Sequence, residues 1–230
     1  MTGTAGGGGS KNATLPFLEI RSLRHDYRQP DGSLLQVLRL DSLRAFRGEA
    51  LAVVGPSGSG KTTLLHILAA LVRPTGGEVL FEGRSLNAPC PSGARWRALS
   101  VGYVFQDVNL LPDFSVLENL LLAAEISGVP RAAARERALS LLRRLGIEGR
   151  GHNRPAKLSL GEQQRAAVAR AVIHAPPLVL ADEPTASLDA ENARIVTDLL
   201  LELCEESRSL LVTATHDEAV KKRFRRFVAL

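Results

Sequence analysis

Apolar residues along the chain follow two periods, which predict strands alternating with helices. Short alternating or continuous apolar runs predict strands at 17–23, 34–46, 50–55, 76–83, 101–106, 178–182, 209–215 and the C-terminal end. Apolar residues at helical spacing predict helices over 61–72, 159–174, 190–206 and 217–224. Because the two kinds of element alternate, we expect an α/β fold with a mainly parallel sheet covered on both faces.

Two segments depart from this alternation. Residues 107–158 carry two helical patterns separated by a Ser-Gly-Val-Pro break, and they predict an inserted helical subdomain. Residues 1–15 are rich in Gly, Ser and Thr without an apolar period, which is typical of a flexible tail. We therefore expect one domain over 16–230, whose core comprises 16–106 and 159–230.

The composition indicates a soluble globular protein. Of 230 residues, 45% are hydrophobic and 23% charged, which excludes global disorder, and no apolar stretch approaches the ~18 residues of a membrane span. Cys90 and Cys204 lie far apart, which argues against a disulfide framework or a zinc site and favours a reducing compartment. The first residues lack the pattern of a secretory signal. The net charge of +5 permits an acidic partner, such as nucleic acid, anionic lipid or nucleotide.

The segment GPSGSGKT at 55–62 matches the phosphate-loop pattern G-x-x-x-x-G-K-[ST] between a predicted strand and helix. Glycines let consecutive N–H groups curl around an anion, and the helix N-terminus adds its dipole. Lys61 can reach the β- and γ-phosphates, and the Thr62 hydroxyl can ligate Mg²⁺. A chance glycine-rich turn is the alternative, which the strand–helix context disfavours. The expected nucleotide-binding residues are Gly55, Pro56, Ser57, Gly58, Ser59, Gly60, Lys61, Thr62 and Thr63.

Asp182 and Glu183 end the predicted strand 178–182, at the edge where open α/β sheets bind ligands. Asp182 suits Mg²⁺, and Glu183 can polarise an attacking water as a base. Alternatively, the pair caps the next helix or faces solvent. The phosphate loop favours the catalytic interpretation.

Further motifs follow in a fixed order: Gln106 after a strand, LSLGEQQR at 158–165, SLD at 187–189, and His216 in ATHD. With the phosphate loop and LVLADEPT, they resemble the ATP-binding subunit of an ABC transporter from about residue 17 to residue 230. The resemblance implies a RecA-like P-loop NTPase core with an antiparallel β subdomain and an α-helical insert. It also implies that the chain hydrolyses ATP with Mg²⁺.

The resemblance assigns further roles residue by residue. Tyr27 corresponds to the aromatic residue that stacks on adenine, although it could be an ordinary exposed aromatic. Gln106 corresponds to the residue that senses Mg²⁺ and water, and His216 to the one that holds the γ-phosphate, the water and Glu183. The implied catalytic residues are Glu183, His216 and Gln106, and the implied Mg²⁺ ligands are Thr62, Gln106 and Asp182.

The signature is implied to act on a partner subunit's ATP, and the D-loop is a further motif of the resemblance. The signature residues are Ser159, Leu160, Gly161 and Glu162, and the D-loop comprises Ser187, Leu188 and Asp189. Ser159 also fits a helix N-cap that Glu162 completes as a capping box, and the two roles are compatible. Leu160 replaces the first Gly of LSGGQ and Glu162 replaces the Gln, which makes this the weakest correspondence.

The resemblance also implies partners and a location. It implies an ATP-dependent homodimer and a separate integral membrane permease docked on 107–158, with the chain cytoplasmic and peripheral on the inner face of the membrane. The run 104–120 resembles ATPases of lipoprotein release, macrolide export and cell division, which favours export or extraction from the membrane. Basic residues of the insert can face such a partner or simply solvent: Arg131, Arg135, Arg137, Arg143 and Arg144.

Two alternatives stay open. One is a soluble ABC-fold ATPase acting on nucleic acid, which only the positive net charge supports, so no direct nucleic-acid partner is expected. The other is a catalytically weak regulatory subunit, favoured only if Leu160 disables the signature.

Overall fold

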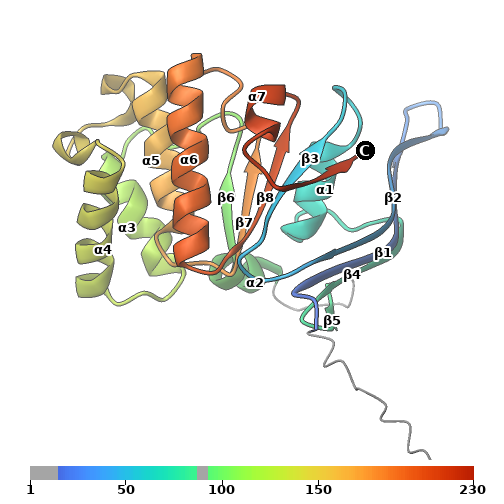
Figure 1. The fold of residues 1–230 in the computed structure, drawn as a ribbon. Helices are drawn as coiled ribbons and strands as arrows, with labels where there is room; N and C mark the ends of the chain where they lie inside the picture. Colours follow the sequence, from blue (N-terminus) through green and yellow to red (C-terminus); the bar gives the residue numbers. More distant parts are fainter. Residues whose placement is uncertain (1–14, 87–92) are drawn as a thin grey trace, which may run out of the picture.

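The computed structural model describes residues 15–86 and 93–230. The predicted tail, apart from Leu15, and Cys90 lie outside the described residues. Within them, strands and helices form two sheets with helices packed around them (Figure 1). The predicted α/β class is confirmed. Among the described residues, no helix is long and apolar enough to cross a membrane.

One sheet of the described chain is parallel throughout, with the order β6-β7-β8-β3-β9. Its strands are β3 (Ala50–Val54), β6 (Val101–Val104), β7 (Leu178–Asp182), β8 (Leu210–Thr215) and β9 (Arg226–Ala229). The other is antiparallel, with the order β2-β1-β4-β5. Its strands are β1 (Leu18–Arg28), β2 (Leu34–Ala45), β4 (Gly76–Phe81) and β5 (Arg84–Ser85).

The helices pack on both faces of the parallel sheet. They are α1 (Lys61–Leu68), α2 (Gly93–Ser100), α3 (Val116–Ile126), α4 (Arg131–Arg144), α5 (Leu160–Val172), α6 (Ala190–Glu206) and α7 (Glu218–Lys221), with short 3₁₀ turns at Glu148–Arg150 and Pro155–Lys157. In Figure 1, α3 to α6 lie on one side of the sheet, and β1, β2 and β4 lie on the other.

Strand β7 explains this two-sided packing. Successive side chains of a strand point to opposite faces. Leu178 and Leu180 pack with α1 and the antiparallel sheet, whereas Val179 and Ala181 pack with α3, α4, α5 and α6. A continuous apolar run therefore buries both faces, as the sequence predicts for a parallel strand.

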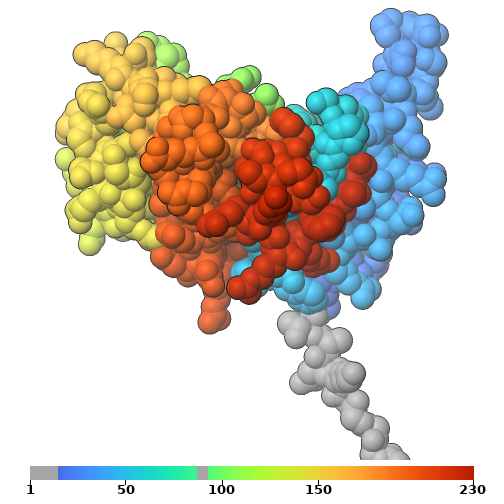
Figure 2. Space-filling model, turned by 45° about the horizontal axis from the view of Figure 1, so that its top comes forward, coloured from blue at the N-terminus to red at the C-terminus, as the bar shows by residue number. Residues whose placement is uncertain are grey.

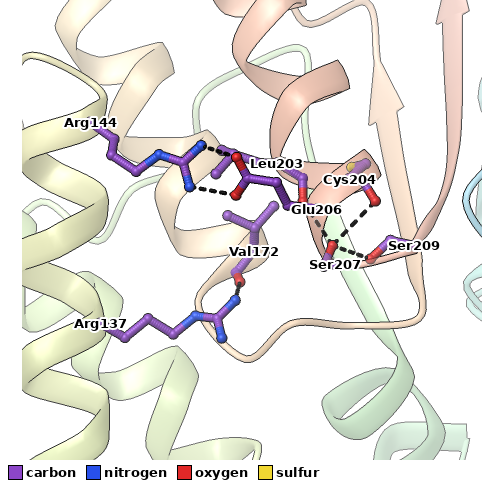
Figure 3. A network of polar contacts seen from close by, with 8 residues as sticks. All are labelled: Arg137, Arg144, Val172, Leu203, Cys204, Glu206, Ser207 and Ser209. Atoms are coloured by element: carbon purple, nitrogen blue, oxygen red, sulfur yellow. Dashed lines mark hydrogen bonds and ion pairs between the residues drawn. The ribbon is translucent and has the colours of Figure 1, made fainter.

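Polar contacts join α4 to the core (Figure 3). Arg144 donates two hydrogen bonds to the Glu206 carboxylate, at 2.7 and 2.8 Å, and Arg137 donates to the Val172 carbonyl at 3.3 Å. Two of the five arginines that could face a partner are thus engaged within the chain.

Several predicted boundaries are wrong, each for a local reason. The helix predicted to reach Val72 ends at Leu68, because Ala70 adopts φ +53° and the Leu71 and Val72 N–H groups both bond to the His66 carbonyl. The helix predicted over 217–224 is only the short α7. Helix α2 was not predicted, because it lacks an apolar stripe and none of its residues is fully buried.

Candidate active site at the carboxyl edge of the parallel sheet

The phosphate loop joins β3 to α1 and depends on its glycines. Gly58 and Gly60 have φ values of +81° and +91°, which side chains on L-residues rarely allow. A Cβ at Gly60 would lie 2.3 Å from the Val37 carbonyl oxygen of β2. The loop can therefore pass under β2 only with glycine at this position.

Lys61, the first residue of α1, turns back over this loop. Its buried ammonium donates to the carbonyls of Gly55 and Pro56 at 2.9 and 3.1 Å. It also lies 3.7 Å from the Glu183 carboxylate. A buried charge needs such partners, and phosphate oxygens can replace the two carbonyls as acceptors.

Thr62 and Asp182 meet although 120 positions separate them in sequence. The Thr62 hydroxyl donates to the Asp182 carboxylate at 3.2 Å. Burial raises the pKa of Asp182, and the Thr62 hydrogen bond only partly offsets this. A buried carboxylate beside a hydroxyl is a hard-oxygen pair that suits Mg²⁺.

Glu183 joins the lysine to His216. One carboxylate oxygen lies 3.7 Å from the Lys61 ammonium, and the other lies 2.6 Å from Nδ1 of His216. Glu183 adopts φ +46°, and its N–H donates to the Ala214 carbonyl at 3.0 Å. The strained backbone turns the side chain out of the sheet toward the phosphate loop. His216, which follows β8, keeps an exposed side chain.

Two hollows flank this cluster. One, of about 360 Å³, is lined by the phosphate loop together with Val37, Gln106 and Glu183. The other, of similar volume, lies between the start of the loop and His216. Figure 2 brings this edge forward and shows the loop region (cyan) beside the C-terminal segment (red). Gln106 therefore shares a hollow with the loop, although β6 ends at Val104 and not at Gln106 as predicted.

Tyr27 lies on β1 and pairs in register with Leu35 of β2, two residues from Val37. Its ring packs edge-on against His25, with the ring centroids 4.6 Å apart, and it keeps 45% of its surface exposed. The exposed ring is available for stacking. Val37 is a lining residue that the sequence did not reveal, because its contact with Gly60 depends on how the two sheets pack.

The signature begins α5. Ser159 is the N-cap, its side chain accepts from the Glu162 N–H at 3.3 Å, and the Glu162 carboxylate accepts from the Ser159 N–H at 2.8 Å. The predicted capping box is therefore present. Glu162 also accepts from Arg150, which lowers its pKa. Within the described residues, no hydrogen bond joins this segment to the phosphate loop of the same chain.

The D-loop leads into α6. Asp189 caps the helix by accepting from the N–H groups of Glu191 and Asn192, at 3.0 and 2.9 Å. Ser187 is exposed, and the Leu188 N–H donates to the Thr185 carbonyl. Like Val37, Asn192 is a residue near the site that the motifs did not indicate. Its position three residues after an N-cap is a typical capping position.

Comparisons with known proteins agree with this geometry. The ABC transporter family model matches residues 38–186. The chain is 45% identical to the lipoprotein-releasing system ATP-binding protein LolD of Syntrophus aciditrophicus, over 93% of this chain and 96% of that protein. It is 39% identical to the macrolide export ATP-binding/permease protein MacB of Sodalis glossinidius, over 94% of this chain but 33% of that protein. A solved dimeric ATP-binding cassette, in a post-hydrolysis state with ADP and Pi, superposes with a TM-score of 0.84 at 33% identity, covering 93% of this chain and 94% of that one.

Proposed function

This chain belongs to the ABC transporter family and is an ATPase, and we propose that it drives a separate membrane permease as the motor subunit of a transporter. The observation that carries the proposal is the cluster of Lys61, Glu183 and His216 beside the Thr62–Asp182 pair. A cation, a base and an imidazole at one sheet edge fit hydrolysis of a phosphoanhydride.

In this proposal Glu183 takes the proton of the attacking water. Its 2.6 Å contact with His216 supports the role, because the imidazole fixes the direction of the carboxylate. Lys61 exchanges the carbonyls of Gly55 and Pro56 for phosphate oxygens when ATP binds. Backbone N–H groups of the loop cradle the phosphates, and Tyr27 stacks on adenine.

We assign Mg²⁺ to Thr62, Asp182 and Gln106. The hydroxyl–carboxylate pair supports the assignment, as does the raised pKa of Asp182, since a cation would relieve the cost of burying its charge. When bound, the ion would neutralise charge on the phosphate oxygens.

Each site is completed by a second copy of the chain. The Ser159 hydroxyl, the first turn of α5 and the D-loop then approach the partner's ATP. The exposed N-cap of α5 supports this arrangement, because a helix N-terminus binds anions and this one is exposed. The related cassette solved with ADP and Pi is likewise dimeric.

The permease docks on the segment 107–158 and the groove beside it, and we propose that this segment acts as a helical unit. A hollow of about 410 Å³ separates α2 and β6 from the ends of α3 and α5. Ile126 is exposed at its rim, and both ring nitrogens of His174 are buried without a partner. Burial and Arg137 lower the pKa of His174 to about 4, so it is a neutral group able to bond to a docked segment.

The relatives favour a direction of transport. The names of the LolD and MacB relatives refer to lipoprotein release and macrolide export. By analogy, the permease exports a substrate or extracts it from the membrane, and the chain is held on the cytoplasmic face through this permease.

Replacing Glu183 tests the catalytic assignment. E183Q should bind ATP with unchanged affinity, lose at least about 99% of turnover, and accumulate an ATP-dependent dimer in size-exclusion chromatography. E205Q, an exposed carboxylate at the far end of α6, is the matched control and should hydrolyse normally. Wild-type turnover by E183Q would show that another group is the base.

A further inference from the structure

Asn192, in the first turn of α6, makes contacts in two directions. Its Nδ2 donates to the Asp189 carboxylate at 2.6 Å, which joins it to the D-loop. Its Oδ1 accepts from Arg165 of α5 at 3.0 Å, which joins it to the signature helix. One amide thus bridges two segments that are distant in sequence.

The same amide touches the signature itself. A Cβ at Gly161 would lie 2.7 Å from Oδ1 and 3.0 Å from Cγ of Asn192. Gly161 is buried, and its backbone does not require a positive φ. A side chain at position 161 would therefore displace the Asn192 amide, and the conformation of the loop does not itself demand glycine.

The chemistry of the contact fixes the orientation of the amide. Its donor end faces a carboxylate and its acceptor end faces a guanidinium, so a flipped amide would oppose like partners at both ends. The hydrogen bonds from Asn192 also lower the pKa of Asp189, which keeps that carboxylate ionised. Helix capping alone requires only the Asn192 N–H, which already bonds to Asp189. The contacts of the Asn192 amide with Arg165 and Gly161 are therefore not part of the N-cap of α6.

We infer that Asn192 is a positioning residue for hydrolysis: it couples the D-loop to the first turn of the signature helix, so that both approach the partner's ATP as one unit. The inference rests on the proposed function, in which the two segments complete a site in the second copy. It also explains the glycine at 161, since any side chain there would displace the bridging amide.

The test is a double-substitution cycle on ATP turnover by the full chain. N192A should lower kcat about tenfold, or about 1.4 kcal/mol in activation free energy, while ATP affinity changes less than about twofold, because the phosphate loop is untouched. G161A should have a similar effect, because its Cβ displaces the amide. The double variant should be no worse than N192A alone, because removing the amide also removes the clash.

Two controls separate this effect from loss of stability. E206A breaks an ion pair at the other end of α6 and should leave kcat unchanged. Thermal melting of N192A should stay within a few degrees of the wild type. Additive losses near a hundredfold, or a kcat for N192A within twofold of the wild type, would overturn the inference.

The E183Q background separates this inference from the proposed function. If E183Q forms an ATP-dependent dimer, N192A in that background should need more ATP to dimerise. A dimer that forms with unchanged ATP dependence overturns the coupling role alone. Failure of E183Q itself to dimerise refutes the proposed dimer, and the coupling role with it.

Discussion

Two helices of this chain begin with the same capping box, which allows the two roles of Ser159 to be separated. At α5 the Glu162 N–H reaches Ser159 at 3.3 Å and the return bond is 2.8 Å. At α3 the Glu118 N–H reaches Ser115 at 3.2 Å and the return bond is 2.7 Å. The two hydrogen bonds of each box match, although the Ser115 hydroxyl also donates to Glu118 at 2.7 Å, and only the α5 box lies in the proposed signature. Ser115 is therefore a matched control.

The expected effects follow from this match. S159A and S115A each lose the cap hydrogen bond from the N–H three residues on, and S115A also loses the exposed hydroxyl bond to Glu118. Loss of the N-cap should lower the free energy of unfolding by about 1 kcal/mol in each variant. In a chain of this size that is about 2–4 °C in melting temperature. S159A should also lose about a hundredfold in kcat, the usual cost of removing one donor to a developing anion. S115A should keep wild-type turnover.

A third variant, S159D, should keep the stability of the wild type but lose turnover. S159D keeps a good N-cap and places a negative charge near the helix N-terminus, so stability should be retained or slightly raised. Turnover should nevertheless be lost, because the carboxylate would repel the partner's phosphate. Urea denaturation and phosphate release, measured on all three proteins, give the comparison. If S159A turns over like S115A, Ser159 is only a cap and the proposed trans site is wrong.

Other predictions concern the buried charge and the packing of α4. Burial raises the pKa of Asp182, so its favourable contribution to folding is present below its ordinary pKa and is lost as pH rises through the raised value. Without nucleotide, D182N should therefore have a higher melting temperature than the wild type at pH 7, and this difference should disappear at acid pH. It should also lose Mg²⁺-dependent hydrolysis. Equal melting temperatures at pH 7 would contradict this prediction. L142A removes a fully buried side chain and should cost about 2–5 kcal/mol in urea denaturation. R144A breaks a partly exposed ion pair and should cost no more than about 1 kcal/mol, and a larger loss would indicate that the pair holds α4 to the core.

Elements with strong local signals were predictable from the sequence. The bounds of β7 and α6 match the prediction, because an uninterrupted apolar run and an Asp N-cap mark them. The weakly apolar α2 was missed, and the end of α1 was placed too late. The apolar pattern was not sufficient in either case, because α2 has no fully buried residue and α1 stops where Ala70 adopts a positive φ although the apolar residues continue to Val72.

The site was predictable residue by residue but not as a set of contacts. The phosphate loop and the strand end identified Lys61 and Glu183 by their chemistry, and the resemblance to ABC ATP-binding subunits added His216. Their proximity depends on β8 lying between β7 and β3 in the sheet, an order that differs from the order of the strands along the chain. The bridge made by Asn192 depends on how α5 packs against α6, and no local pattern encodes that.

The substitution at Leu160 illustrates how the contacts change the interpretation of a motif. Leu160 is 44% exposed on the first turn of α5, while Ser159 is held by the capping box and Gly161 lies close to the Asn192 amide. The features that a signature offers to phosphate are a hydroxyl and helix N-terminal N–H groups, and neither is supplied by the side chain at 160. The residue that departs from LSGGQ is thus the one whose side chain the local geometry does not use. We therefore expect L160G to change turnover far less than N192A. That result would show that the contacts supporting the signature matter more for turnover than its match to LSGGQ.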